Sequence, residues 1–263
     1  MVNLYEFGAD EMGYLSLPDK PPIAGVLMLP DPLGPRPVVE QRADLLAKLG
    51  YVTLVVDLYN GEVTDHVETA RRIQQKVDAP QAQKAIHAGF KLLTDSPRYK
   101  TNKIVLAAWS DNYALARAVT DSMVTLPLVG TSWLEPDRIN ILATLPPDRS
   151  PLQIIMIREA ETGGFDQTMN AYDQRRGKQS EVFTYADRRG FLLQPDPSAS
   201  SVEAWSSLIT FWKKLTEGHY VAAPAPEALP IPPASSPEAS PVKEPVPSDP
   251  IRPPTTRKHP RLR

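Results

Sequence analysis

The chain has 263 residues, and 41% of them are hydrophobic, which is enough to bury a sizeable core. The 29 lysine and arginine residues nearly balance the 31 aspartate and glutamate residues, which argues against a nucleic-acid-binding protein. The absence of cysteine excludes disulfides, thiolate metal sites and a cysteine nucleophile. The sequence has no apolar run long enough to span a membrane and no signal-peptide pattern, so we expect a cytoplasmic protein without a membrane partner.

Elements can be predicted from two patterns: unbroken apolar runs indicate buried strands, and apolar residues at helical spacing indicate helices. In chain order we expect a strand at 23–29, a helix at 37–49, a strand at 51–56, a helix at 80–93, a strand at 103–109, a helix at 112–122, strands at 125–130 and 152–157, a helix at 165–176, a strand at 181–185 and a helix at 201–215. This alternation predicts the α/β class, as a three-layer sandwich around a mostly parallel, doubly wound sheet. Functional residues are then expected just past the carboxyl ends of the strands.

Proline is concentrated at the C-terminal end, where residues 220–263 hold 13 of the 29 prolines. A segment with so few large apolar side chains cannot offset its ordering entropy. We therefore expect one globular domain over 1–219 and a disordered, proline-rich tail over 220–263. Residues 247–252 match a PxxPx[RK] pattern, which makes the tail a candidate ligand for a protein partner with an aromatic groove.

The strand at 103–109 runs directly into Ser110 and then into a helix. A strand, a sharp turn with a central serine and a helix form the setting of a nucleophile elbow. The turn usually has small residues two positions before and after the nucleophile. Here those positions are Ala108 and Asn112, of which the asparagine is the bulkier. A serine at the start of a helix also fits a helix cap, so both roles stay open for Ser110.

Several segments together resemble the dienelactone hydrolase family of α/β-hydrolases. PDPLG at 30–34 is similar to the family's His-Glu-x-x-Gly stretch, VDLYNG at 56–61 to its PDLYG segment, the Ser110 elbow to its Gly-x-Cys-x-Gly, and TYADRRGF at 184–191 to its YPGAGHGF. The resemblance covers about residues 10–216. It implies an α/β-hydrolase fold, a triad of nucleophile, acid and histidine on strand-end loops, and hydrolysis of carboxylic esters or lactones.

The position that matches the family histidine is Arg189, which stays protonated and cannot accept a proton from a serine hydroxyl. The four histidines of the chain lie elsewhere, and His66 is the one expected near the rim of the site. The others are His87, His219 and His259.

Two further positions depart from the family. The residue expected to complete the oxyanion hole aligns with Pro32, which has no backbone N–H to donate. The family aspartate falls at Ala160, with Glu161 and Glu159 beside it as candidate acids.

These departures favour a degenerate hydrolase, or pseudoenzyme, that keeps Ser110 and binds a small-molecule ester, lactone or anion. The start of the elbow helix and Arg189 are the candidate anion contacts. Two alternatives stay open: an active serine esterase that uses Ser110 with a non-standard base such as His66, and an interaction protein that acts through its tail. We expect no cofactor and no metal, because the sequence has no thiolate, no paired-histidine spacing and no glycine-rich phosphate loop.

Overall fold

The computed structural model describes residues 1–10, 12–122, 127–136, 150–157, 180–188 and 190–219. The chain divides into two compact units, Met1–Ala225 and Pro226–Arg263, and the described residues all belong to the first. The helix expected at 165–176 and the proline-rich tail with its partner-binding pattern lie outside the described residues.

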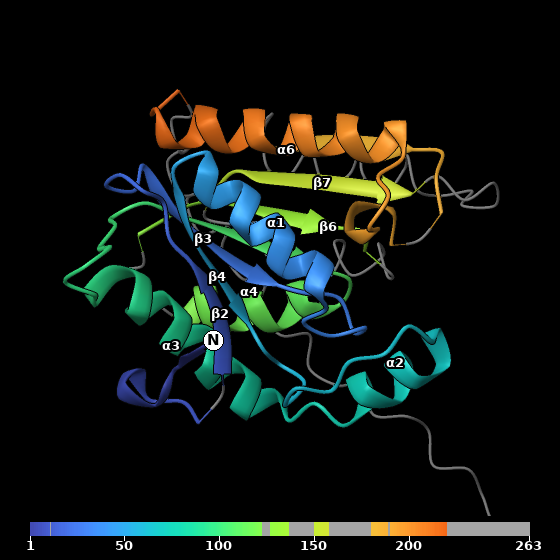
Figure 1. Ribbon diagram of the computed structural model, residues 1–263, viewed down its shortest axis with the longest axis horizontal. Helices are drawn as coiled ribbons and strands as arrows, with labels where there is room; N and C mark the ends of the chain where they lie inside the picture. The colour runs from blue at the N-terminus through green and yellow to red at the C-terminus, as the bar shows by residue number, and fades with distance from the viewer. Residues whose placement is uncertain (11, 123–126, 137–149, 158–179, 189, 220–263) are drawn as a thin grey trace, which may run out of the picture. The chain divides into compact units, whose positions relative to one another are not determined.

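Within the described residues, eight strands form one sheet in the order β1-β2-β4-β3-β5-β6-β7-β8 (Figure 1). The strands are β1 (Val2–Asn3), β2 (Met12–Ser16), β3 (Ala24–Leu29), β4 (Tyr51–Val56), β5 (Ile104–Trp109), β6 (Leu128–Leu134), β7 (Leu152–Ile157) and β8 (Ser180–Tyr185). β2 pairs antiparallel with both β1 and β4, and every other pair is parallel. The predicted α/β class with a mostly parallel sheet is confirmed.

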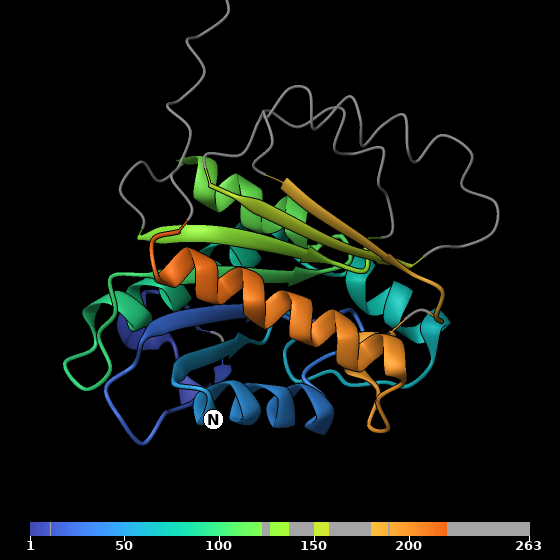
Figure 2. The same ribbon diagram turned by 90° about the horizontal axis from the view of Figure 1, so that it is seen from above.

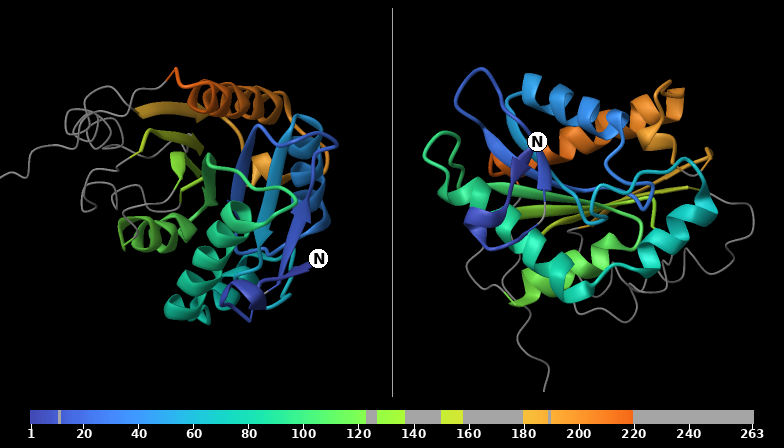
Figure 3. Two further views of the ribbon diagram at one scale, coloured as in Figure 1. Left: turned by 90° about the vertical axis from the view of Figure 1, so that its left-hand side faces the viewer. Right: turned by 60° about the horizontal axis from the view of Figure 1, so that its bottom comes forward.

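Helices cover both faces of this sheet, as the views in Figures 2 and 3 show. The helices are α1 (Pro37–Lys48), α2 (Val67–Gln75), α3 (Ala79–Asp95), α4 (Asn112–Ser122) and α6 (Ala199–Thr216), with short 3-10 helices η1 (Tyr5–Phe7) and η3 (Phe191–Leu193). One buried cluster lies under α1 and α6 and a second lies under α3 and α4, so the core has two halves separated by the sheet. In the part of the chain that the structure describes, no helix is long and apolar enough to cross a membrane.

The predicted strands at 51–56 and 152–157 coincide with β4 and β7, but the strand expected at 125–130 is shifted. β6 continues to Leu134 because its polar residues find partners inside the protein. The Ser132 hydroxyl accepts a hydrogen bond from Trp212 Nε1 at 2.9 Å, and Thr131 Oγ1 lies 3.3 Å from Ser150 Oγ. The strand therefore ends one residue before Glu135, which places that side chain at the carboxyl edge of the sheet.

The loop after β3 is pinned against the loop after β4 at this edge. Thr64 N donates to Leu33 O at 3.0 Å, and Gly34 between them has a φ of +89°. A Cβ on Gly34 would lie 2.2 Å from the carbonyl oxygen of Glu62, which no side chain tolerates. This close approach fixes the loop that carries Pro32, the residue at the expected oxyanion position.

We expect Gly34→Ala to lower the free energy of unfolding by more than the roughly 1–2 kcal/mol that a left-handed conformation costs a residue with a Cβ, because the clash with Glu62 adds to that cost. Gly61→Ala is the matched control, since Gly61 has a φ of +78° and a Cβ there would meet nothing within 4 Å. Urea unfolding measures both variants. Equal losses would contradict the steric role of Gly34.

Candidate functional site

Ser110 occupies the tight turn between β5 and α4, at the carboxyl edge of the sheet. Its φ is +50°, a left-handed conformation that is uncommon outside glycine. Residues of β6 hold the turn on both sides: Ser110 N donates to Leu134 O at 2.9 Å, and Trp133 Nε1 donates to Ser110 O at 2.6 Å. A strained serine held between a strand and a helix has the geometry of a nucleophile elbow.

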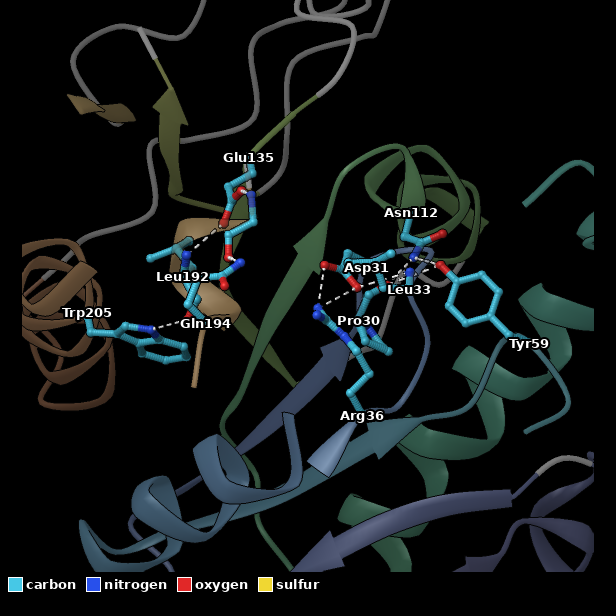
Figure 4. A network of polar contacts seen from close by, with 11 residues as sticks. Pro30, Asp31, Leu33, Arg36, Tyr59, Asn112, Glu135, Leu192, Gln194 and Trp205 are labelled. Carbon is cyan, nitrogen blue, oxygen red and sulfur yellow. Dashed lines mark hydrogen bonds and ion pairs between the residues drawn. The ribbon is translucent and has the colours of Figure 1, made fainter. Parts of the chain in front are cut away.

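Asn112, the bulky residue of the elbow, is turned toward Tyr59 and Pro30 (Figure 4). Its Nδ2 donates to the Pro30 carbonyl at 2.5 Å and to the Tyr59 hydroxyl at 2.6 Å, and the Tyr59 hydroxyl donates to Pro30 at 3.2 Å. Burial raises the pKa of Tyr59 well above its usual range, so the phenol keeps its proton and remains a donor. This Asn112–Tyr59–Pro30 network joins the elbow to the loops after β3 and β4.

The segment after β4 that resembles the family most specifically is a structural turn. Asp57 is 4% exposed, and its two carboxylate oxygens accept Tyr59 N at 2.8 Å and Gly61 N at 2.6 Å. Asn60 and Gly61 take φ values of 54° and 78°, which the side chain of Asp57 stabilises from inside the turn. The result is a rigid loop that presents the Tyr59 hydroxyl to the elbow.

The loop after β3 brings Asp31 and Leu33 to the same edge of the sheet (Figure 4). Pro32 between them lines the same cavity. The Asp31 carboxylate pairs with Arg36 Nη2 at 2.9 Å and accepts Leu33 N at 3.2 Å. Burial raises the pKa of Asp31, while Arg36 and the Leu33 N–H act in the opposite direction. At the expected oxyanion position Pro32 therefore has no N–H, and the N–H of the next residue is already bonded to Asp31.

These loops surround a cavity of about 930 Å³, which lies within the size range of small-molecule sites. Its apolar lining consists of Pro32, Leu33, Val67, Ala70, Val77, Trp109, Ala114 and Leu115. Its polar lining includes Asp31, Arg71, Gln74, Gln75, Ser110, Asp111, Asn112, Glu135 and Gln194. Ser110 is 8% exposed, and among the described residues its hydroxyl has no hydrogen-bond partner.

The structure places some of the predicted site residues and not others. Ser110 and Pro32 line the same cavity, as the elbow interpretation requires. Arg189, Glu159 and Glu161 lie outside the described residues, so the predicted anion contact and the predicted acid stay predictions.

Of the histidines that the structure describes, none lines the cavity. His66 precedes α2 with a side chain that is 81% exposed, and His87 and His219 are exposed on α3 and after α6. His259 lies outside the described residues. Among the described residues, then, no imidazole is placed to accept the proton of Ser110.

Glu135 lines the cavity although the sequence pattern does not predict it. It is 4% exposed and has a φ of +49°, and its carboxylate accepts Gly190 N at Oε2 and Leu192 N at Oε1, the latter at 3.0 Å. The predicted strand at 125–130 ends five residues before Glu135, so the sequence does not place Glu135 at a strand end. β6 in fact ends at Leu134, so Glu135 lies directly after a strand, where functional residues of parallel sheets are found.

The sequence model of the dienelactone hydrolase family matches residues 12–109. Similar solved structures include the dienelactone hydrolase from Anabaena variabilis ATCC 29413 (14% identity, TM-score 0.56, covering 81% of this chain and 94% of that chain). Another is a dienelactone hydrolase-like promiscuous phosphotriesterase from metagenomic libraries (15% identity, TM-score 0.59, covering 79% of this chain and 94% of that chain). A third is the butyrate-bound esterase 2 of Thermogutta terrifontis (13% identity, TM-score 0.56, covering 85% of this chain and 96% of that chain). No curated protein matches the chain. The predicted resemblance to the family is confirmed over residues 12–109, a match that ends before Ser110, and the similar solved structures confirm the predicted α/β-hydrolase fold.

We expect Asn112→Ala and Tyr59→Phe each to lower the free energy of unfolding by about 1–3 kcal/mol, because each leaves buried polar groups of the network short of a partner. Tyr5→Phe, at a tyrosine that is 70% exposed, controls for the loss of a hydroxyl. Urea unfolding of the single and double variants gives the coupling energy. Costs that add within about 0.5 kcal/mol would contradict the network.

Proposed function

We propose that this chain is a hydrolase-like protein that binds a small ligand beside Ser110 and does not carry out the triad chemistry of the dienelactone hydrolase family. The match of residues 12–109 to that family and the α/β-hydrolase fold support the hydrolase-like part of the proposal. One observation carries this proposal: Ser110 keeps the elbow conformation and lines the cavity, yet its hydroxyl has no hydrogen-bond partner among the described residues. A serine hydroxyl is a weak nucleophile at neutral pH unless a base accepts its proton. In this proposal the Ser110 elbow contributes to ligand binding and not to catalysis.

The oxyanion side of the site supports the same proposal. Pro32 cannot donate, and the Leu33 N–H is bonded to Asp31. Losing one oxyanion donor lowers the rate of other hydrolases by about 10²–10³. Ester hydrolysis by a serine depends most on a base and on the oxyanion donors. The described part of the chain offers no base beside Ser110, and Pro32 offers no donor.

The lining of the cavity favours an uncharged ester or lactone with an apolar body. Apolar side chains from α2 and α4 form its walls, and the Ser110 hydroxyl is available to a carbonyl oxygen. Among the described lining residues the cation is Arg71, whose side chain is 67% exposed and paired with Glu68 at 2.9 Å. Binding of a small anion would instead require Arg189 as the cationic contact.

A second candidate function, an active serine esterase, is favoured by the strain at Ser110. A left-handed serine costs on the order of 1–3 kcal/mol, and such strain is common at catalytic positions. In this candidate Ser110 Oγ bonds to the carbonyl carbon of an ester, its proton passes to a non-standard base, and the alcohol leaves before water releases the acid. The exposed side chain of His66, which does not line the cavity, speaks against His66 as that base.

Turnover separates the two candidates. We expect the wild type and Ser110→Ala to hydrolyse p-nitrophenyl butyrate at the same background rate, because no residue that the structure describes is placed to act as a base for Ser110. We also expect a fluorophosphonate probe to leave Ser110 unlabelled, as judged by peptide mass spectrometry. A rate that Ser110→Ala abolishes, or a labelled Ser110, would establish the esterase and refute the proposal.

Binding is tested with 4-nitrobutyranilide, an amide analogue that resists hydrolysis. We expect it to quench tryptophan fluorescence in a saturable way, since Trp109 lines the cavity. Ala114→Leu, which narrows the cavity, should weaken the binding, whereas Ala199→Leu at the exposed start of α6 should not. Quenching that does not saturate, or that both variants change equally, would contradict a ligand in this cavity.

A further inference from the structure

Two neighbouring strands end in left-handed residues at this edge of the sheet. Ser110 follows β5 with a φ of +50°, and Glu135 follows β6 with a φ of +49°. The bond from Ser110 N to Leu134 O, at 2.9 Å, ties the two strand ends together. The elbow accounts for the conformation of Ser110. The conformation of Glu135 needs a reason of its own, because strain persists only where other interactions hold it.

The contacts of the Glu135 carboxylate supply that reason. Both oxygens are used, with Oε2 accepting Gly190 N and Oε1 accepting Leu192 N at 3.0 Å, so the side chain spans from β6 to the loop after β8 (Figure 4). Hydrogen bonds to an ionised carboxylate are about twice as strong as bonds between neutral groups. Glu135 N also donates to Ile155 O at 2.8 Å, which fixes its backbone to β7.

The same loop is anchored on its other side and within itself. Trp205 Nε1 of α6 donates to Leu192 O at 2.9 Å, and Gln194 Nε2 donates to Gly190 O at 3.1 Å. Gly190 and Gln194 line the cavity, as Glu135 does. The loop is therefore a wall of the cavity, and Glu135 holds this wall from the strand ends.

The two bonds require this particular side chain. A glutamine has one carbonyl oxygen for two N–H donors, and its NH₂ group would face the second donor with another donor. An aspartate is one methylene shorter, so its carboxylate cannot reach the loop from the same backbone position.

We propose that Glu135 is the positioning residue of the Ser110 cavity. Glu135 holds the loop after β8 and thereby fixes the positions of Gly190 and Gln194 relative to Ser110. The cavity is then already formed before a ligand binds. A ligand that enters a preformed cavity does not have to order the loop that lines it. The inference rests on the proposed function, since it concerns ligand binding in this cavity.

The test measures the dissociation constant of 4-nitrobutyranilide at 25 °C, where the folded state of each variant is verified by circular dichroism. We expect Glu135→Gln to raise this constant about tenfold, because part of the binding free energy is then spent on ordering the loop. Glu203→Gln, at an exposed position of α6, is the matched control and should bind as the wild type does. A loss of stability alone would lower the melting temperature and leave the constant at 25 °C unchanged.

Hydrogen exchange of the same proteins tests the mechanism. In Glu135→Gln the amides of Gly190 and Leu192 should exchange faster, while the amides of β5 stay protected. Unchanged exchange, or faster exchange with an unchanged dissociation constant, would overturn the role of Glu135. Glu135→Asp, whose carboxylate reaches neither N–H, is a second variant, and it should raise the dissociation constant and the exchange rates at least as much as Glu135→Gln does. A wild type that shows no saturable binding would refute the proposed function itself, which is a different result from equal binding by the wild type and the variant.

Discussion

The junction between the ends of β5 and β6 supports the rest of the site. A left-handed serine is unfavourable by itself, so the turn at Ser110 exists only because β6 accepts its N–H and the Trp133 indole bonds its carbonyl. Trp133 is 1% exposed and stacks on Tyr113 of α4, with ring centroids 4.5 Å apart. The helix, the turn and the neighbouring strand are thus locked as one unit, and the cavity is built on it.

The shape of a nucleophile elbow and its chemistry come from different parts of this chain. The shape depends on sheet pairing and on buried side chains, all of which lie in well-packed elements around Ser110. The chemistry depends on a base and on N–H donors supplied by separate loops, and in the loop after β3 Pro32 offers none. Because the two requirements are physically independent, a chain can lose the reaction and keep the fold, the cavity and the strained serine.

The sequence predicts β4 and β7 at their observed bounds because a strand buried on both faces is mostly apolar, and a single buried polar residue in each, Thr53 or Gln153, does not interrupt the pattern. It does not predict the antiparallel strands β1 and β2, which are short and lie at one end of the sheet. The end of β6 is hidden by Thr131 and Ser132, whose hydroxyls are buried but bonded to distant residues. Such long-range partners leave no local pattern, and the same holds for the bonds from Gly190 and Leu192 to Glu135.

Buried polar groups tie the loops at the carboxyl edge to one another. Asp31 pairs with Arg36 in the loop after β3, Asp57 organises the loop after β4, Asn112 joins both to the elbow, and Glu135 holds the loop after β8. Since an unsatisfied buried group costs about 1–3 kcal/mol, each of these contacts resists movement of its loop. The described loops at this edge are consequently held in place, and a cavity whose walls are held in place favours binding. Since no described residue bonds the Ser110 hydroxyl, the proposed ligand can use it as a hydrogen-bond partner.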